Sequence, residues 1–141
     1  MQNLEQVLPE IVGLRPDFMT VTYGALGSTQ ERTLDIATTI QNRFNLPTAC
    51  HLTCVGSSKA DLDDILQRIR AAGIRNIVAL RGDPPAGETK FVAPKDGLAH
   101  ANELVEFIRA TEKSGRIGPI GIAVAGYPEK HVEAPDLKTD L

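Results

Sequence analysis

The chain has 141 residues, of which 42% are hydrophobic and 23% charged, with a formal net charge of −3. This balance is typical of a globular domain with its own core, and a slightly acidic chain without a basic patch argues against nucleic-acid and anionic-membrane partners. No apolar run approaches the roughly 20 residues of a membrane span, and the amino-terminal segment lacks the pattern of a signal peptide. We therefore expect a cytoplasmic protein with no membrane partner.

The first half of the chain shows a helix, a strand and a second helix. Apolar residues recur at helical spacing from Leu4 to Val12, and β-branched and aromatic residues over 18–24 predict a strand. Ser28 and Glu31 have the spacing of a capping box, so a helix is expected to begin there. The expected buried stripe of this helix is Leu34, Ile36, Ala37, Ile40 and Phe44.

The next segment repeats the alternation of strand and helix. A strand is predicted over 48–54, and Ser58 with Asp61 forms a second capping box that begins a helix ending at Gly73. Another strand is predicted over 75–80. The inward positions of the helix are Leu62, Ile65, Leu66 and Ile69.

The last segment adds one more helix and one more strand. The helix carries Leu104, Val105 and Ile108, and the strand is predicted over 120–126. From Tyr127 the chain is polar and begins a further helix near its end.

The two cysteines, Cys50 and Cys54, fall in one predicted strand. Four strand residues span roughly 13 Å, whereas a disulfide requires Cα atoms within about 7 Å. Without further cysteines or a His pair nearby, a zinc site is also disfavoured. We expect two buried free thiols and no metal.

Helices that alternate with strands apolar on both faces indicate a parallel α/β sheet. Right-handed crossovers leave two architectures, a doubly wound open sheet and a (β/α)₈ TIM barrel. A complete barrel needs about 250 residues. On the barrel alternative, residues 1–141 are therefore expected to form one domain, a partial barrel of about four parallel strands.

Polar or glycine-containing groups follow each predicted strand, where ligands bind in parallel α/β folds. Plainer interpretations exist for each group alone, such as a hydrogen-bonded core His51 or an ion pair between Arg81 and Asp83. No dinucleotide fingerprint, P-loop or nucleophile elbow is present in the sequence. The residue types suit an organic cofactor better than nucleophilic hydrolysis. The four groups are Thr22-Tyr23-Gly24, His51-Leu52-Thr53, Arg81-Gly82-Asp83 and Gly126-Tyr127-Pro128.

Four segments, VTYGALGSTQERT, HLTC, NIVALRGDPP and AGYPEKHVEAPDLKTDL, resemble consecutive blocks of the methylenetetrahydrofolate reductase family. The resemblance runs from about Leu14 to Leu141, in the family's order and spacing. It implies a (β/α)₈ barrel with FAD at the carboxyl ends of the strands, and it disfavours the doubly wound sheet.

The activity implied by this resemblance belongs to one-carbon metabolism. NADH or NADPH reduces FAD and leaves, and hydride then passes to 5,10-methylenetetrahydrofolate to give 5-methyltetrahydrofolate. The implied partners are therefore a folate substrate and a nicotinamide nucleotide, with a homo-oligomer in the complete enzyme.

Matching positions imply roles for individual residues. Thr22 resembles the residue beside the reacting edge of the isoalloxazine ring, and Asp83 resembles the carboxylate close to both flavin and folate. His100 stands where the family often has Tyr. The positions that match FAD contacts are Thr22, Tyr23, Ala25, His51, Arg81, Gly82, Asp83, Ala101, Tyr127, His131, Ala134 and Asp140.

Some parts of the family pattern are not found in the 141 residues. The family has a preceding strand with a Phe-Glu-Phe-Phe-Pro-like motif, whose Glu is the general acid, and a second half of the barrel that binds folate. We therefore expect a segment of the enzyme that is inactive alone. The alternative is a non-catalytic flavin- or nucleotide-binding half-barrel that self-associates to close its sheet.

Overall fold

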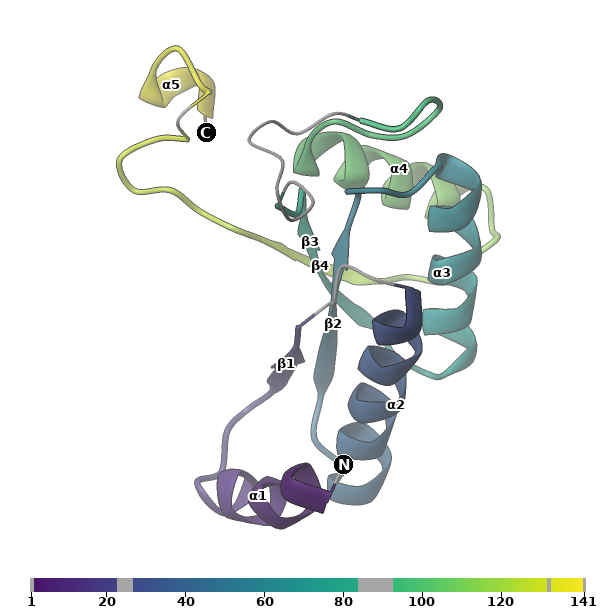
Figure 1. Cartoon of the computed structure of the whole chain (residues 1–141), viewed down its shortest axis with the longest axis vertical. Coiled ribbons are helices and arrows are strands. Elements are labelled where there is room, and N and C mark those ends of the chain that lie inside the picture. Colours follow the sequence, from purple (N-terminus) through teal and green to yellow (C-terminus); the bar gives the residue numbers. More distant parts are fainter. Residues whose placement is uncertain (1, 23–26, 84–92, 132, 141) are drawn as a thin grey trace.

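The computed structural model describes residues 2–22, 27–83, 93–131 and 133–140. Helices and strands alternate along the chain, as the sequence predicts (Figure 1). In chain order the elements are α1 (Gln2–Gly13), β1 (Met19–Val21), α2 (Gly27–Phe44), β2 (Thr48–Thr53), α3 (Lys59–Ala71), β3 (Asn76–Leu80), α4 (Ala101–Lys113), β4 (Gly121–Val124) and α5 (Leu137–Asp140). No helix in the described ranges is long and apolar enough to cross a membrane.

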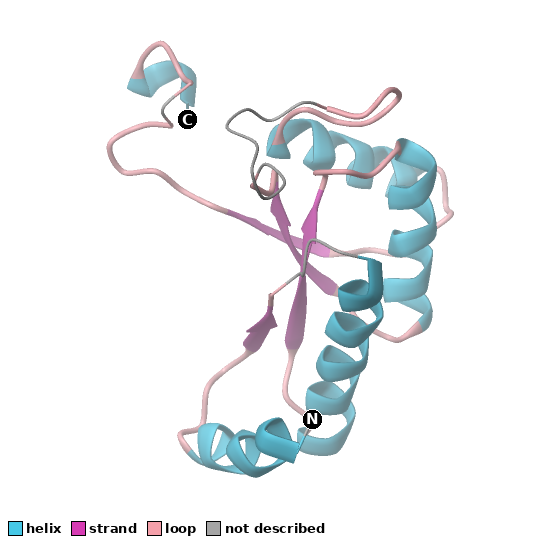
Figure 2. Ribbon diagram, in the orientation of Figure 1, coloured by secondary structure: helices cyan, strands magenta, loops and turns pink. Residues whose placement is uncertain are grey.

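The strands form one parallel sheet in the order β1-β2-β3-β4. Helices α2, α3 and α4 all lie on one face of this sheet, and α1 lies near the amino end of β1 (Figures 1 and 2). A doubly wound sheet would carry helices on both faces, whereas a (β/α)₈ barrel carries them on the outside only. The architecture is therefore a four-stranded part of such a barrel, and the predicted fold class is confirmed.

The two outer strands of the described sheet are shorter than the sequence pattern predicts. The strand expected over 18–24 pairs only from Met19 to Val21, and the one expected over 120–126 pairs from Gly121 to Val124. Each has a neighbour on one side only within the described residues, and each begins level with the first residue of that neighbour, Thr48 for β1 and Asn76 for β4.

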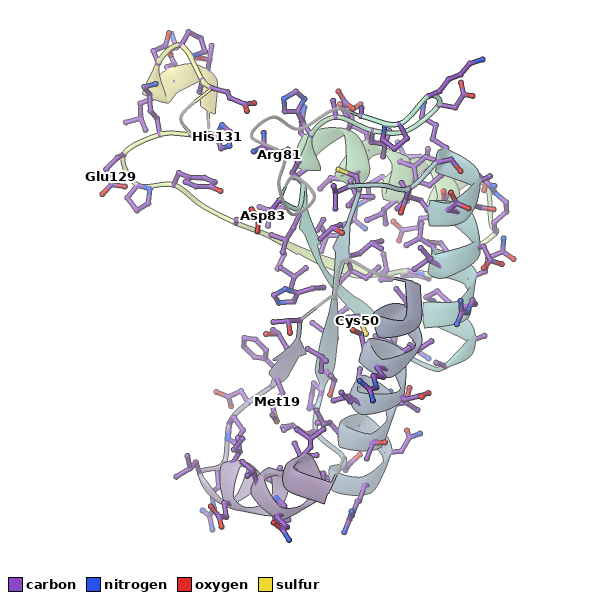
Figure 3. All side chains as sticks on the ribbon, viewed as in Figure 1. Met19, Cys50, Arg81, Asp83, Glu129 and His131 are labelled. Carbon is purple, nitrogen blue, oxygen red and sulfur yellow. The ribbon has the colours of Figure 1, made fainter. Side chains whose placement is uncertain are left out.

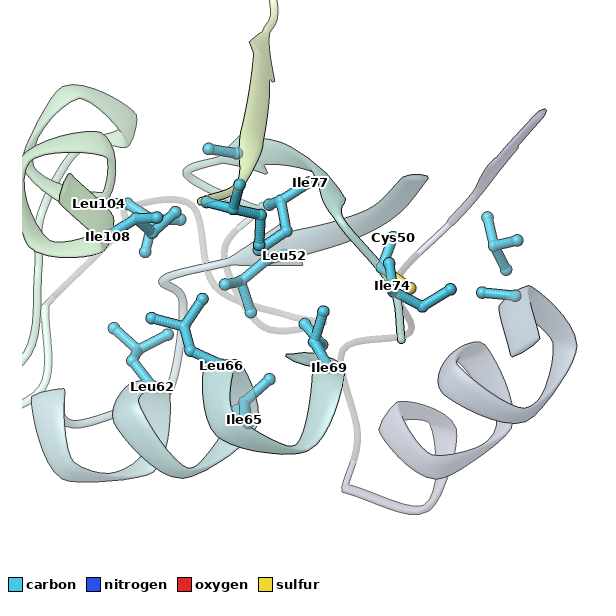
Figure 4. Close-up of a cluster of buried hydrophobic side chains, with 14 of the residues drawn as sticks. Cys50, Leu52, Leu62, Ile65, Leu66, Ile69, Ile74, Ile77, Leu104 and Ile108 are labelled. Carbon is cyan, nitrogen blue, oxygen red and sulfur yellow. The ribbon is translucent and has the colours of Figure 1, made fainter. Parts of the chain in front are cut away.

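The core lies between the sheet and the three covering helices (Figure 4). Cys50 and Leu52 of β2 and Ile77 of β3 are at most 2% exposed and face the helices. All four residues predicted to point inward from α3 are buried. Each fully buried aliphatic side chain contributes about 1.5–3 kcal/mol, so this layer is the main source of stability.

The capping box predicted for α3 is present. The Oγ of Ser58 accepts a hydrogen bond from the backbone N–H of Asp61 at 3.2 Å, and the Asp61 carboxylate accepts from the Ser58 N–H at 2.9 Å. Gly73 follows the helix with φ +80, a conformation that favours glycine. The side chains of the capping box predicted for α2 lie outside the described residues.

Both cysteines are buried and free, as predicted. Burial raises the pKa of Cys50 to about 11 and also raises that of Cys54. Thiols with raised pKa values are poor nucleophiles at neutral pH. Cys50 and Cys54 are therefore packing residues.

The opposite face of the sheet would be the inside of a barrel. Ala49, His51 and Thr53 alternate with the helix-facing residues of β2 and point to this face. Val78 of β3 stands beside His51 in the register, and Ala123 of β4 stands beside Val78. None of the described helices covers this face (Figure 2).

Candidate functional site

The parallel sheet brings the predicted polar groups to the side where all four strands have their carboxyl ends. This side is called the site edge, or simply the edge, below. Thr22 directly follows β1, Arg81 directly follows β3, and Tyr127 comes three residues after β4. His51 lies inside β2, two residues before its end. Figure 3 shows Arg81, Asp83 and His131 at the end of the sheet opposite Met19.

Thr22 is held at the edge through its backbone. The hydroxyl of Thr33, on α2, donates a hydrogen bond to the Thr22 carbonyl at 2.9 Å. This bond ties the first turns of α2 to the end of β1 and leaves the Thr22 side chain exposed. Tyr23 and Ala25, the next two predicted site residues, lie outside the described residues.

The ends of β2 and β3 are joined by the Arg81 carbonyl. It accepts hydrogen bonds from the Val55 N–H at 3.0 Å and from the Cys54 thiol at 3.4 Å. Gly82 then turns the chain with φ +91, and a Cβ there would lie 2.5 Å from Val55 Cγ1. Glycine is required for both reasons, and the turn leaves Asp83 exposed at the edge.

Glu133 connects two of the elements at this edge. The Arg81 guanidinium donates to Glu133 Oε1 at 2.7 Å, and His100 Nε2 lies 3.3 Å from Glu133 Oε2. The hydrogen bond from Arg81 is the main cause that lowers the pKa of Glu133. Glu133 therefore links the end of β3, the start of α4 and the segment after β4, and it is the carboxylate paired with Arg81.

The segment after β4 has its own internal contacts. Tyr127 and His131 meet edge to face with ring centroids 5.0 Å apart. His131 Nδ1 accepts the Glu133 N–H at 3.2 Å, which requires that the ring carry its proton on Nε2 when neutral. Lys130, at φ 90, donates from Nζ to the Ala134 carbonyl at 2.6 Å. These contacts join Tyr127 to His131, His131 to Glu133 and Lys130 to Ala134.

The remaining predicted site residues are spread more widely. Ala101 is the first residue of α4, and His100 before it is the N-cap residue but makes no side-chain cap. The Glu103 carboxylate accepts the Ala99 N–H at 2.7 Å instead. Asp140 belongs to α5, which lies apart from the sheet, and its side chain is outside the described ones (Figure 1).

His51 is half-buried on the inner face, and burial lowers its pKa. It is therefore a neutral imidazole near pH 7, able to donate one hydrogen bond and accept one. A cavity of about 20 Å³ borders His51, but its other lining residues belong to α2, α3 and Cys50 on the helix side. That volume holds about one water molecule, so the cavity is not a cofactor site.

Glu133 was not singled out by its sequence pattern, and Thr53 was named only as part of the HLT group. Glu133 lies between the predicted positions His131 and Ala134, but its pairing with Arg81 spans 52 residues. Thr53 ends the HLT group predicted to lie at this edge, and the structure adds that it is buried, at 8% exposure. Within the described ranges, no group of three or more His, Cys, Asp or Glu residues could hold a metal ion.

Comparisons with known proteins agree with these motifs. The family model for methylenetetrahydrofolate reductase matches residues 1–141. The chain is 45% identical over 134 residues to a probable methylenetetrahydrofolate reductase (NADH) of Oryza sativa, covering 95% of this chain and 22% of that protein. It is 44% identical over 142 residues to methylenetetrahydrofolate reductase (NADH) 1 of Arabidopsis thaliana, covering 99% of this chain and 23% of that protein.

A bacterial relative covers a larger share. The 5,10-methylenetetrahydrofolate reductase of Escherichia coli is 36% identical over 140 residues, which is 99% of this chain and 43% of that protein. The chain thus spans between about a fifth and under half of the length of these relatives. Because the family model matches the chain along its whole length, the chain belongs to the methylenetetrahydrofolate reductase family.

Proposed function

We propose that residues 1–141 form the part of a methylenetetrahydrofolate reductase barrel that holds FAD at the carboxyl ends of its strands. The observation that carries this proposal is the convergence of Arg81, Gly82 and Asp83 with His131 and Glu133 at one edge of a parallel sheet. These residues come from segments more than 40 positions apart, yet they lie within the motifs that the family shares.

The residues at this edge fit such a cofactor. Val78 and Ala123 on the inner face offer apolar surface beside a neutral His51, which suits a flat heteroaromatic ring. Arg81 supplies a fixed positive charge for anionic groups, and Gly82 allows a close approach of the backbone. Bound FAD would supply the hydride chemistry that no side chain of this site can provide.

Asp83 has a distinct proposed role. It is exposed at the edge, next to Gly82 and Arg81. A fixed carboxylate there would stabilise a cationic form of the substrate and oppose added negative charge on its neighbours. Thr22 would lie beside the reacting part of the cofactor. Contacts with FAD are proposed, by family position, for Tyr23, Ala25, Ala101, Tyr127, His131, Ala134 and Asp140.

The other partners follow from the same proposal. The plant relatives carry NADH in their names, so NADH is the first reductant to test, with NADPH as the alternative. The folate substrate would be 5,10-methylenetetrahydrofolate, after the name of the bacterial relative. Residues 1–141 would act as a single domain within a larger, homo-oligomeric enzyme of the cytoplasm.

A second function is favoured by one observation. The edge strand β4 is largely exposed, with Val124 at 59% exposure. Exposed parallel edges favour pairing with another chain. A non-catalytic half-barrel that binds a flavin and self-associates would cover this edge, and sedimentation of the 141-residue chain with and without FAD distinguishes it from a monomeric segment.

Titration of the 141-residue chain with FAD, followed by flavin fluorescence, tests the principal proposal. We expect saturable binding that Arg81→Ala weakens about tenfold or more, since hydrogen bonds to charged groups contribute about 1.5–3 kcal/mol. Lys113→Ala, at the far end of α4, removes the same charge and should leave binding unchanged. Absence of binding, or equal binding by Arg81→Ala, contradicts the proposal.

A further inference from the structure

Thr53, the last residue of β2, has a buried hydroxyl with no hydrogen-bond partner among the described residues. Its side chain is 8% exposed, and its Oγ1 makes no hydrogen bond to any residue of the described ranges. Burial of a hydroxyl without a hydrogen bond is unfavourable. A valine would fill nearly the same volume without this disadvantage, so packing alone does not explain a threonine here.

The other buried threonines in the described ranges have hydrogen-bond partners. Thr48, at the amino end of the same strand, donates to the Leu46 carbonyl at 2.9 Å. Thr111 on α4 donates to the Phe107 carbonyl at 2.9 Å. Among the buried threonines that the structure describes, the unsatisfied hydroxyl is therefore particular to Thr53, at the carboxyl end of β2.

The position of Thr53 connects this hydroxyl with the candidate site. Strand alternation places Thr53 on the inner face with His51, and Leu80 stands beside it in the register. The Gly82 turn passes close over it, since a Cβ at Gly82 would lie 3.1 Å from Thr53 Cβ. Thr53 thus lies at the foot of the turn that presents Arg81 and Asp83.

We infer that the Thr53 hydroxyl is a ligand-binding group of this site, which completes its hydrogen bonding only when the flavin is bound. The inference rests on the proposed function and adds a residue to it. A hydroxyl can both donate to a carbonyl and accept from an N–H, and those groups alternate along the polar edge of an isoalloxazine ring. Thr53 therefore contacts that neutral edge, while the guanidinium of Arg81 suits anionic groups.

Three variants of the 141-residue chain test this inference, each measured by denaturant unfolding without ligand and by FAD titration. Thr53→Val should unfold at the same or a higher denaturant concentration than the wild type, yet bind FAD about tenfold more weakly, which corresponds to about 1.4 kcal/mol. Thr53→Ser keeps the hydroxyl and should bind FAD within about threefold of the wild type. Thr48→Val, the matched control, should unfold at lower denaturant and bind FAD as the wild type does.

Each contrary result has a separate meaning. If Thr53→Val loses stability without ligand as Thr48→Val does, the hydroxyl has a protein partner and the inference is wrong. If Thr53→Val binds FAD as tightly as the wild type, the inference is wrong while the proposed function stands. If the wild-type chain binds no FAD, the proposed function fails and the inference fails with it.

Discussion

Asp83 reaches the edge of the sheet only because Gly82 precedes it. The φ of +91 and the contact of any Cβ with Val55 exclude other residues at Gly82. The turn directs the chain away from β3 immediately after Arg81, whose backbone is bonded to β2. A single glycine therefore decides that the carboxylate is exposed at the site edge.

Asp83→Asn removes the charge of this carboxylate and keeps its size. The test uses a chimera in which residues 1–141 replace the matching segment of the E. coli relative. We expect the midpoint potential of the bound flavin to rise, because a neighbouring negative charge is gone. The folate half-reaction should slow on the order of 10²-fold, the usual cost of removing one preorganised electrostatic group.

Stopped-flow measurement of the two half-reactions separates these effects from a loss of FAD. Asp64→Asn, on the exposed side of α3, removes a charge away from the site and should change neither quantity. An unchanged folate step together with an unchanged potential in Asp83→Asn would show that Asp83 has no electrostatic role.

Glu133 provides a prediction about pH. The hydrogen bond from Arg81 lowers its pKa in the folded chain, so folding favours the ionised form. Its contribution to stability is present above the ordinary glutamate value of about 4.3 and is lost as pH falls through the lower folded value. The difference in unfolding free energy between wild type and Glu133→Gln should therefore be small but constant above about pH 5 and decrease as the pH falls below the ordinary glutamate value.

Denaturant unfolding across that range measures this difference. Exposed ion pairs contribute little, so the comparison needs Glu106→Gln as a control, an exposed α4 carboxylate in no ion pair of the described residues. A difference that grows as pH falls would contradict the assigned pairing of Glu133 with Arg81.

At the scale of the element, α3 is specified by local chemistry. Its capping box, its inward stripe and the glycine after its end each appear where the sequence pattern places them. The capping box and the stripe depend on residues spaced three or four positions apart, and the glycine acts at its own position, so their pattern does not require the rest of the fold. The boundaries of β1 and β4, in contrast, are narrower than their sequence patterns predict, and each strand begins level with the first residue of its neighbour.

Ser58→Ala tests the local origin of α3. The change leaves the Asp61 N–H without its acceptor and should lower the free energy of unfolding by about 1 kcal/mol. Ser58→Asn supplies another acceptor and should lower it by much less. Equal losses for both variants in denaturant titrations would mean that the cap does not stabilise this helix.

For the whole molecule, we expect the 141-residue chain alone to show no measurable reduction of methylenetetrahydrofolate. The chain covers 43% of the bacterial relative, and the general acid and folate-binding residues expected from the family lie outside the matched blocks. The chimera with the bacterial segments should regain NADH-dependent turnover, followed as NADH oxidation with the folate substrate. Turnover by the 141-residue chain, or an inactive but folded and FAD-loaded chimera, would contradict this assignment of roles.

The sequence by itself determined the α/β alternation, the boundaries and buried stripe of α3, the buried state of Cys50 and Cys54, and the family, through motifs such as ALRGDPP. These features depend on local spacing and on runs of neighbouring residues, which a sequence displays directly. Periodicity alone left the choice between a barrel and a doubly wound sheet open, and the family resemblance favoured the barrel. The placement of α2, α3 and α4 on one face of the sheet agrees with it.

Only the tertiary structure decided which polar residues meet. The pairing of Arg81 with Glu133 joins positions 52 residues apart, and the unsatisfied hydroxyl of Thr53 becomes visible only when the Gly82 turn is folded over it. The physical reason is that hydrogen bonding and burial at a sheet edge depend on segments brought together by the crossovers. A sequence pattern can place each residue on its strand or loop, but the contacts between those segments depend on the path of the whole chain.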